Sequence, residues 1–156
     1  MTSPARSASK ATQVVRALRA AHLHDESRQV LLQMACDRIR EWGPPYTSVY
    51  AYMLHADDLV LEAHAGRDTE HTRIPVGTGV CGTAVAERRD QNVADVGAVG
   101  NYLACNVFTK SELVVLIRRG EHILGQLDID SDVPNGFGER AHADVKEVAD
   151  ALAILL

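Results

Sequence analysis

Cys81 and Cys105 lie in glycine-punctuated loop sequence, whereas the third cysteine, Cys36, lies in apolar, helix-like sequence. Thiols close to carboxylic acids can carry out redox or nucleophilic chemistry. Cys81 precedes an expected helix, where the helix dipole and free amides would lower the pKa of its thiol. Each of the two loop cysteines could equally be a small hydrophobic residue of its loop. Cys36 is expected to pack in the core.

Three acidic residues lie in or beside strand-like runs downstream of Cys105. Side chains alternate along a strand, so Leu127 and Ile129 share one face while Asp128 and Asp130 share the other. Two carboxylates that meet in a cavity raise the pKa of one of them, which supplies a proton donor near neutral pH. Glu112 opens the partner strand and is expected to point to the same place. The alternative is a solvated strand end.

Other kinds of site have weaker support. The histidines and thiols are possible metal ligands, but no Cys-x-x-Cys or His-x-x-x-His spacing occurs, so neither a metal nor a cofactor is expected. The run 77–79 (Gly-Thr-Gly) lacks the lysine of a phosphate-binding loop. A net charge of −5 with scattered basic residues and few aromatics does not fit a nucleic-acid-binding surface.

The elements that must position these residues follow from periodicity and turn signals. Helices are expected at 11–21, from a cap at Asp25 or Ser27 to about Trp42, at 82–88 just after Cys81, and from about Glu139 onward. Strands are expected at 48–55, 59–64, 91–94, 113–118 and 123–129, and 66–79 is expected to be loop.

Two hairpins among these strands imply an antiparallel sheet, one face of which the terminal helices must cover. We therefore expect one α+β domain over residues 11–156, after a flexible lead-in at residues 1–10. No apolar run approaches the roughly 20 residues of a membrane span, and the lead-in lacks the apolar stretch of a secretory signal. A cytoplasmic location with reduced thiols is expected.

The motifs between Ile74 and about Asp132 are Ile-Pro-Val-Gly-x-Gly-Val-Cys-Gly-Thr-Ala, Val-Ala-Asp-Val, Ala-Cys, Ser-Glu-Leu-Val-Val and Leu-Asp-Ile-Asp-Ser. Their order and spacing resemble those of the free methionine-(R)-sulfoxide reductases, a family of stand-alone GAF domains. The resemblance covers somewhat over a third of the chain closely. It implies a GAF fold: a central antiparallel sheet with N- and C-terminal helices on one face, and loops plus a short helix over the other. It also implies a homodimer that pairs through terminal helices.

By this resemblance Cys105 is the nucleophile, whose thiolate attacks the sulfoxide sulfur while a carboxylic acid protonates the departing oxygen. A second cysteine would convert the resulting sulfenic acid to a disulfide, which a thioredoxin-like or low-molecular-weight thiol would reduce. Glu112, Asp128 and Asp130 match the family's acids, which would bind the amino group and polarise the sulfoxide. Tyr52 matches an aromatic residue of the substrate pocket.

The chain departs from the family pattern at two positions. His71, expected to be a solvent-facing loop residue, stands where members usually carry the resolving cysteine, so Cys81 or an external thiol such as glutathione would have to replace it. Ser48 stands where a pocket tryptophan is expected, so a large apolar wall for the substrate methyl group is missing. The alternative function is therefore a non-catalytic GAF module that senses a small molecule or an oxidant.

Overall fold

A computed structural model describes residues 7–103 and 107–156 of the chain. Cys105 and the first part of the expected lead-in, residues 1–6, lie outside these ranges. In chain order the elements are α1 (Lys10–Leu23), α2 (Arg28–Arg40), β1 (Ser48–His55), β2 (Asp58–Ala65), β3 (Arg73–Pro75), α3 (Gly79–Glu87), β4 (Gln91–Val93), the 3-10 turn η1 (Val96–Ala98), β5 (Ser111–Arg119), β6 (His122–Ser131) and α4 (Glu139–Leu155).

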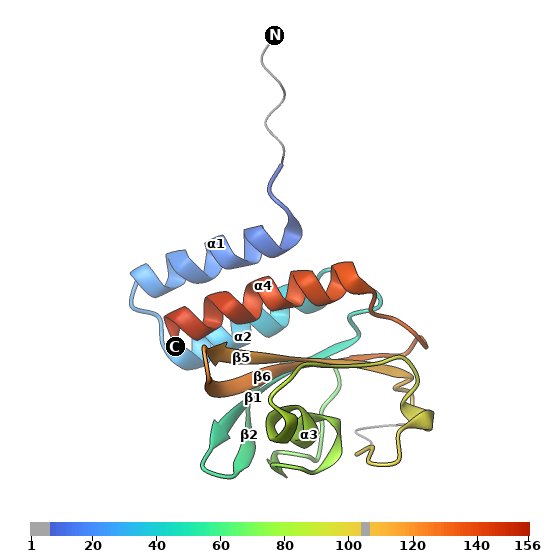
Figure 1. Ribbon diagram of the computed structural model, residues 1–156. Coiled ribbons are helices and arrows are strands. Elements are labelled where there is room, and N and C mark those ends of the chain that lie inside the picture. The colour runs from blue at the N-terminus through green and yellow to red at the C-terminus, as the bar shows by residue number, and fades with distance from the viewer. Residues whose placement is uncertain (1–6, 104–106) are drawn as a thin grey trace.

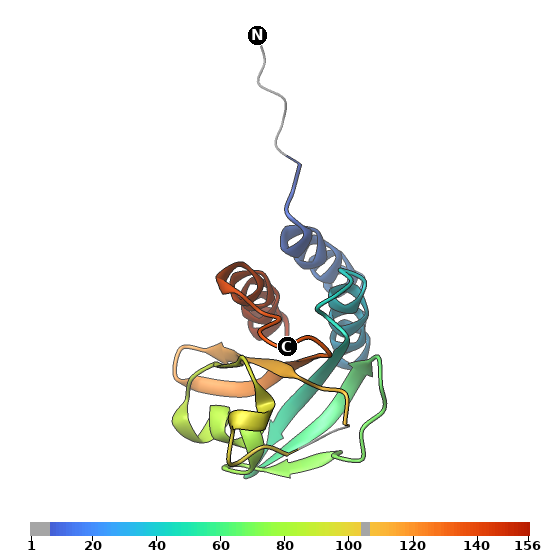
Figure 2. The ribbon, with the colours of Figure 1, turned by 90° about the vertical axis from the view of Figure 1, so that its right-hand side faces the viewer.

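The strands form one antiparallel sheet in the order β3-β2-β1-β6-β5-β4. Helices α2 and α4 pack on one face, α2 over β1 and β2 and α4 over β5. Helix α1 packs mainly on α4 and α2 and so forms an outer layer, while α3 lies against the opposite face (Figures 1 and 2). The expected α+β arrangement is confirmed. None of the helices in the described ranges has the length and hydropathy needed to cross a bilayer.

Alternation along β1 shows how the sheet separates two cores. Val49, Ala51 and Met53 face the helices, whereas Tyr50 and Tyr52 belong to the cluster on the α3 side. Strand β6 alternates in the same way, so its apolar residues of the helix-facing core are Leu127 and Ile129, as the sequence predicts.

Of the two expected caps of helix α2, Asp25 and Ser27, Ser27 is the one used: its side chain accepts a hydrogen bond from the Val30 amide. Its apolar side enters the helix-facing core, and Cys36 is fully buried there, as expected. Burial raises the pKa of the Cys36 thiol to about 12, so this cysteine is a packing residue and not a reactive thiol.

Two expectations for the chain between β2 and β4 are wrong. The segment 66–79 is not all loop, because Arg73–Pro75 adds a short edge strand to β2. Helix α3 begins at Gly79 instead of after Cys81, so Cys81 lies within the first turn of the helix. Gly82 permits this placement, since a Cβ atom there would lie 2.6 Å from the carbonyl oxygen of Pro75.

Candidate functional site

The predicted acids gather on the sheet face that lies under α3. Glu112 on β5 and Asp130 on β6 are direct partners across the two strands, and Asp128 is the partner of Tyr50 on β1. The residue exposures are 5% for Glu112, 1% for Asp128 and 2% for Asp130. The expectation of one shared face is therefore confirmed, and the acids point into the protein interior and not to a solvated strand end.

Helix α3 brings Cys81 onto these acids. The Cys81 Sγ lies 3.8 Å from Oε1 of Glu112, and one ligand atom each from Cys81, Glu112 and Asp128 all lie within 4.8 Å of one another. The thiol is buried, with 5% of the residue exposed. A helix and two strands thus assemble a thiol–carboxyl cluster from residues that are distant in sequence.

The expectation of a lowered pKa for Cys81 is wrong. Burial raises the pKa of this thiol well above its ordinary value, and the negative charges of Asp128 and Glu112 raise it further. The position in the first turn of α3 does favour a thiolate, but desolvation and two adjacent carboxyl groups outweigh that effect. In the structure Cys81 is consequently a thiol.

Burial also changes the two aspartates. Desolvation raises the pKa of Asp128, although hydrogen bonds with Glu112 and Cys81 oppose the change. The pKa of Asp130 is raised well above its ordinary value by burial and then by the charges of Asp128 and Asp132. Among the described residues, Oδ1 of Asp128 and Oδ2 of Asp130 have no hydrogen-bond partner. Burial therefore favours the protonated form of these carboxyl groups, and each aspartate has bonding capacity left for a ligand.

A small cavity adjoins the cluster. It has a volume of about 10 Å³ and is lined by His71, Ile74, Thr78, Gly79, Val80, Cys81, Leu103, Glu112 and Asp128. Such a volume suits one water molecule or one ion and is far too small for an amino acid. The placement of His71 corrects the expectation of a solvent-facing side chain, since this residue is half-buried in the cavity wall.

Two tyrosines on β1 form hydrogen bonds with the backbone of the segment that follows β2. The Tyr52 hydroxyl donates to the carbonyl oxygen of His71, and the Tyr50 hydroxyl donates to that of Arg67, each at 2.7 Å. Tyr52, the predicted pocket aromatic, is thus fully buried beside the site. Tyr50 was missed by sequence reasoning, although it shares the period-two face of Tyr52.

The space at Ser48 is occupied by the chain itself. Ser48 is buried, and its Oγ accepts a hydrogen bond from the Arg67 amide at 3.0 Å. A Cβ atom on Gly66 would lie 2.6 Å from that Oγ. The loop after β2 therefore closes over the position where the family pattern has a tryptophan.

Further polar residues at the site were not expected from the sequence. Arg67 makes two hydrogen bonds of 2.6 Å to the carboxylate of Asp132, and its guanidinium lies 4.9 Å from the centroid of the Phe108 ring. Gln126 is fully buried, and neither polar atom of its amide has a partner among the described residues. Gln126 could have been found, because it shares the alternation of Asp128 and Asp130.

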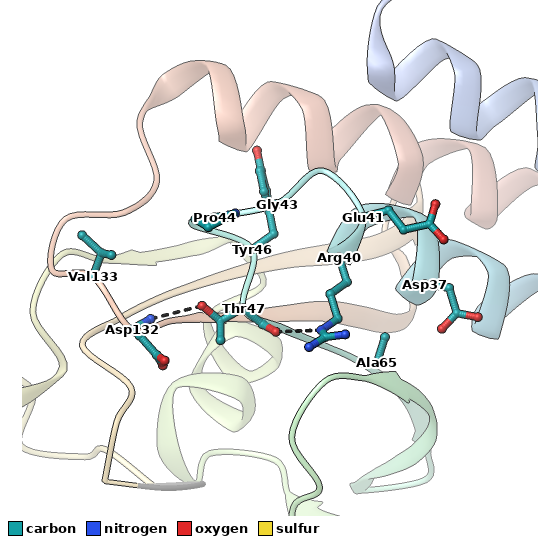
Figure 3. A pocket seen from close by; sticks show the side chains of 10 residues that line it. All are labelled: Asp37, Arg40, Glu41, Gly43, Pro44, Tyr46, Thr47, Ala65, Asp132 and Val133. Atoms are coloured by element: carbon teal, nitrogen blue, oxygen red, sulfur yellow. Dashed lines mark hydrogen bonds between the residues drawn. The ribbon is translucent and has the colours of Figure 1, made fainter.

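A larger groove lies at the C-terminal end of α2 and includes Asp132, the partner of Arg67 (Figure 3). It has a volume of about 610 Å³ and is lined by Asp37, Arg40, Glu41, Gly43, Pro44, Tyr46, Thr47, Ala65, Asp132 and Val133. Arg40 Nε donates to the carbonyl oxygen of Thr47 in its wall. Of its three acids, Asp37 and Glu41 are exposed and Asp132 is paired with Arg67, so the buried cluster at Cys81 has the stronger case for chemistry.

Known proteins are similar to this chain in sequence and in fold. Residues 25–156 match the family model of the GAF domain. The free methionine-R-sulfoxide reductase of Escherichia coli is 37% identical over 105 residues, which are 67% of this chain and 63% of that protein, so the match spans less than two thirds of that relative.

Solved structures extend the similarity. The type II free methionine-R-sulfoxide reductase of Thermoplasma acidophilum has 37% identity and a TM-score of 0.79, with 82% of this chain and 91% of that chain covered. The free methionine-R-sulfoxide reductase of Neisseria meningitidis, solved in complex with its substrate, has 28% identity and a TM-score of 0.83, with 96% and 91% covered.

Proposed function

The chain belongs to the GAF domain family and, within it, to the group of the free methionine-R-sulfoxide reductases, and we propose on this premise that it reduces free L-methionine-(R)-sulfoxide to methionine. The observation that carries the proposal is the buried cluster of Glu112, Asp128 and Asp130 beside Cys81. A free amino acid brings an ammonium group, and buried carboxylates are suited to bind it.

The proposed chemistry begins at Cys105. Its thiolate attacks the sulfoxide sulfur, and a protonated carboxyl among Asp128, Asp130 and Glu112 gives its proton to the sulfoxide oxygen. The bond between the two sulfurs and the sulfur–oxygen bond of the substrate then break as the oxygen passes to Cys105. The methionine sulfur gains two electrons, the Cys105 sulfur loses them, and Cys105 is left as a sulfenic acid. Raised pKa values at the two aspartates favour this donor role. Tyr52 would form part of the substrate pocket.

A thiol must then attack the sulfenic acid, with release of water and formation of a disulfide. We assign this step to Cys81, or to an external thiol if Cys81 does not reach Cys105. A thioredoxin-like or low-molecular-weight thiol would reduce the disulfide. A cytoplasmic location and a homodimeric state belong to the same proposal.

The test is the release of methionine from the purified full chain, supplied with the R epimer and either dithiothreitol or thioredoxin. Cys105→Ser should abolish release, whereas Cys36→Ala should retain it, because Cys36 lies in the helix-facing core. The S epimer and a peptide-bound sulfoxide should be poor substrates. No methionine with either reductant would refute the proposal.

A sensing module is the second candidate, and the small cavity favours it. An amino acid cannot enter a volume of about 10 Å³ unless the lining residues move apart. Two measurements separate the functions: a sensor of a smaller molecule or of an oxidant would neither bind the sulfoxide in calorimetry nor release methionine in the presence of reductant.

A further inference from the structure

We propose that Cys81, Glu112 and Asp128 form a binding site for a thiophilic divalent cation, with Zn²⁺ as the best match. In one respect this site rests on the proposed function, because a cation bound there would exclude the substrate's ammonium group. The site itself requires no assumption about catalysis.

The first support is the donor geometry. Zn²⁺ binds thiolate sulfur at about 2.3 Å and carboxylate oxygen at about 2.0–2.2 Å, usually in a tetrahedral arrangement. Neighbouring donors of such a site are therefore separated by roughly 3.6 Å. The Sγ of Cys81 and Oε1 of Glu112 are 3.8 Å apart, and the Asp128 donor lies within 4.8 Å of both. Small side-chain rotations would close this set on one ion.

The second support is a buried carboxyl oxygen without a hydrogen-bond partner. Asp128 is 1% exposed, and its Oδ1 has no hydrogen-bond partner among the described residues. Of the described residues that line the cavity, His71 is the one with a basic side chain. A buried carboxylate needs a proton or a cation, and a divalent ion would serve two acids and the thiolate together.

The third support is size. The cavity of about 10 Å³ admits a single ion as it stands, whereas an amino acid requires rearrangement. The sulfur donor favours Zn²⁺ over Mg²⁺ or Ca²⁺, which prefer oxygen. Three protein donors leave the fourth position open for water, the pattern of a site with an exchangeable ligand.

Binding is measured on the reduced full chain without substrate, by competition for Zn²⁺ with a chromogenic chelator. Loss of one ligand should weaken binding by more than about tenfold, since even outer partners of metal ligands account for 10- to 100-fold. We expect that loss in Cys81→Ser and, as a second variant, in Asp128→Asn. Cys36→Ala is the matched control, because it changes an equally buried thiol in the other core.

The absorption spectrum of bound Co²⁺ reports whether a thiolate binds the ion. The loaded protein should show a thiolate-to-Co²⁺ charge-transfer band that persists in Cys105→Ser and disappears in Cys81→Ser. Circular dichroism establishes that each variant is folded. Zn²⁺ affinity unchanged in folded Cys81→Ser, or a band that depends on Cys105 instead, would overturn the proposal.

Inhibition is tested by single turnovers of pre-reduced protein, because thiol reductants themselves bind Zn²⁺. Zn²⁺ should raise the sulfoxide concentration needed for half-maximal rate and leave the maximal rate unchanged. Zn²⁺ binding in a protein that never releases methionine would refute the proposed reductase and leave the metal site standing. Methionine release without Zn²⁺ binding would refute the metal site and leave the proposed reductase standing.

Discussion

The Sγ of Cys81 lies 3.8 Å from Oε1 of Glu112, although 31 positions separate them in the sequence. The contact joins the first turn of α3 to the beginning of β5, close to Asp128 of β6. It keeps the thiol in an acidic, water-poor environment. Cys81 is therefore a protected thiol in the substrate-free protein, and any resolving role requires a change in its surroundings.

Alkylation by iodoacetamide measures this protection. Cys81 should react far more slowly in the native protein than in urea, because burial and adjacent acids raise the pKa of its thiol. Glu112→Gln removes one of these charges and should accelerate the reaction, with about tenfold more thiolate for each unit by which the pKa falls. Cys36 lies in the other core and should react at an unchanged rate. Native Cys81 that reacts as fast as in urea would contradict this account.

The aspartates should matter for turnover more than for folding. Asp128→Asn and Asp130→Asn keep the side-chain shape but remove the acid, so each should lower kcat/KM for methionine sulfoxide by about 10²-fold or more. Asp150→Asn, at an exposed position of α4, is the control and should retain the wild-type rate. Wild-type kcat/KM in both site variants would contradict the assignment of an aspartate as the proton donor.

Gly79→Ala should destabilise the protein. Gly79 has φ +65°, and a Cβ atom there would lie 2.9 Å from the Cβ of Leu103. The left-handed backbone costs a non-glycine residue about 1–2 kcal/mol, and the contact adds to this. Gly77→Ala is the matched control, because its φ is +94° but nothing lies within 4 Å of its Cβ position. Urea unfolding should give a larger loss for Gly79→Ala, and an equal loss would mean that Leu103 is free to move away.

The pair of Arg67 and Asp132 should give a pH-dependent contribution to stability. Its hydrogen bonds hold the pKa of Asp132 below the ordinary value, so the contribution is present above that ordinary value, about 4, and is lost as the pH falls through the lowered one. Both side chains are about a third exposed, which limits the effect to roughly 1 kcal/mol.

The measurement is the difference in unfolding free energy between wild type and Asp132→Asn at pH 7 and at acid pH. We expect this difference to shrink with acid and to vanish when Arg67→Gln is already present. A difference that is the same at both pH values would assign the stabilisation to another interaction.

Much of the fold could be predicted because local patterns agree with the tertiary structure. Alternation predicted that Asp128 and Asp130 share one face, and Ser27, one of the two expected caps, is the N-cap of α2. The edge strand at 73–75 was not predicted from the sequence. It has three residues, includes a proline and is defined by its pairing with β2. Short edge strands carry too few residues for a periodic signal.

The state of Cys81 could not be predicted from local sequence. Its position near the start of a helix suggested an activated thiol, but its pKa depends on Asp128 and Glu112, which tertiary structure brings to it. The Arg67–Asp132 pair likewise spans 65 positions and has no local signature. Electrostatic properties of a buried site depend on every group packed around it, and those groups come from distant parts of the chain.

The central position of β1 and β6 in the sheet determines when the site forms during folding. Strands β1 to β3 and strands β4 to β6 are each built from neighbouring sequence, and the two halves meet at the β1–β6 pair, where Ser48 lies opposite Asp130. Neither half holds the tyrosines and the acids together. This long-range pairing is costly in chain entropy and forms slowly. Binding of the sulfoxide should therefore return in one step with the whole sheet during refolding, and a fragment that lacks either half should retain none of it.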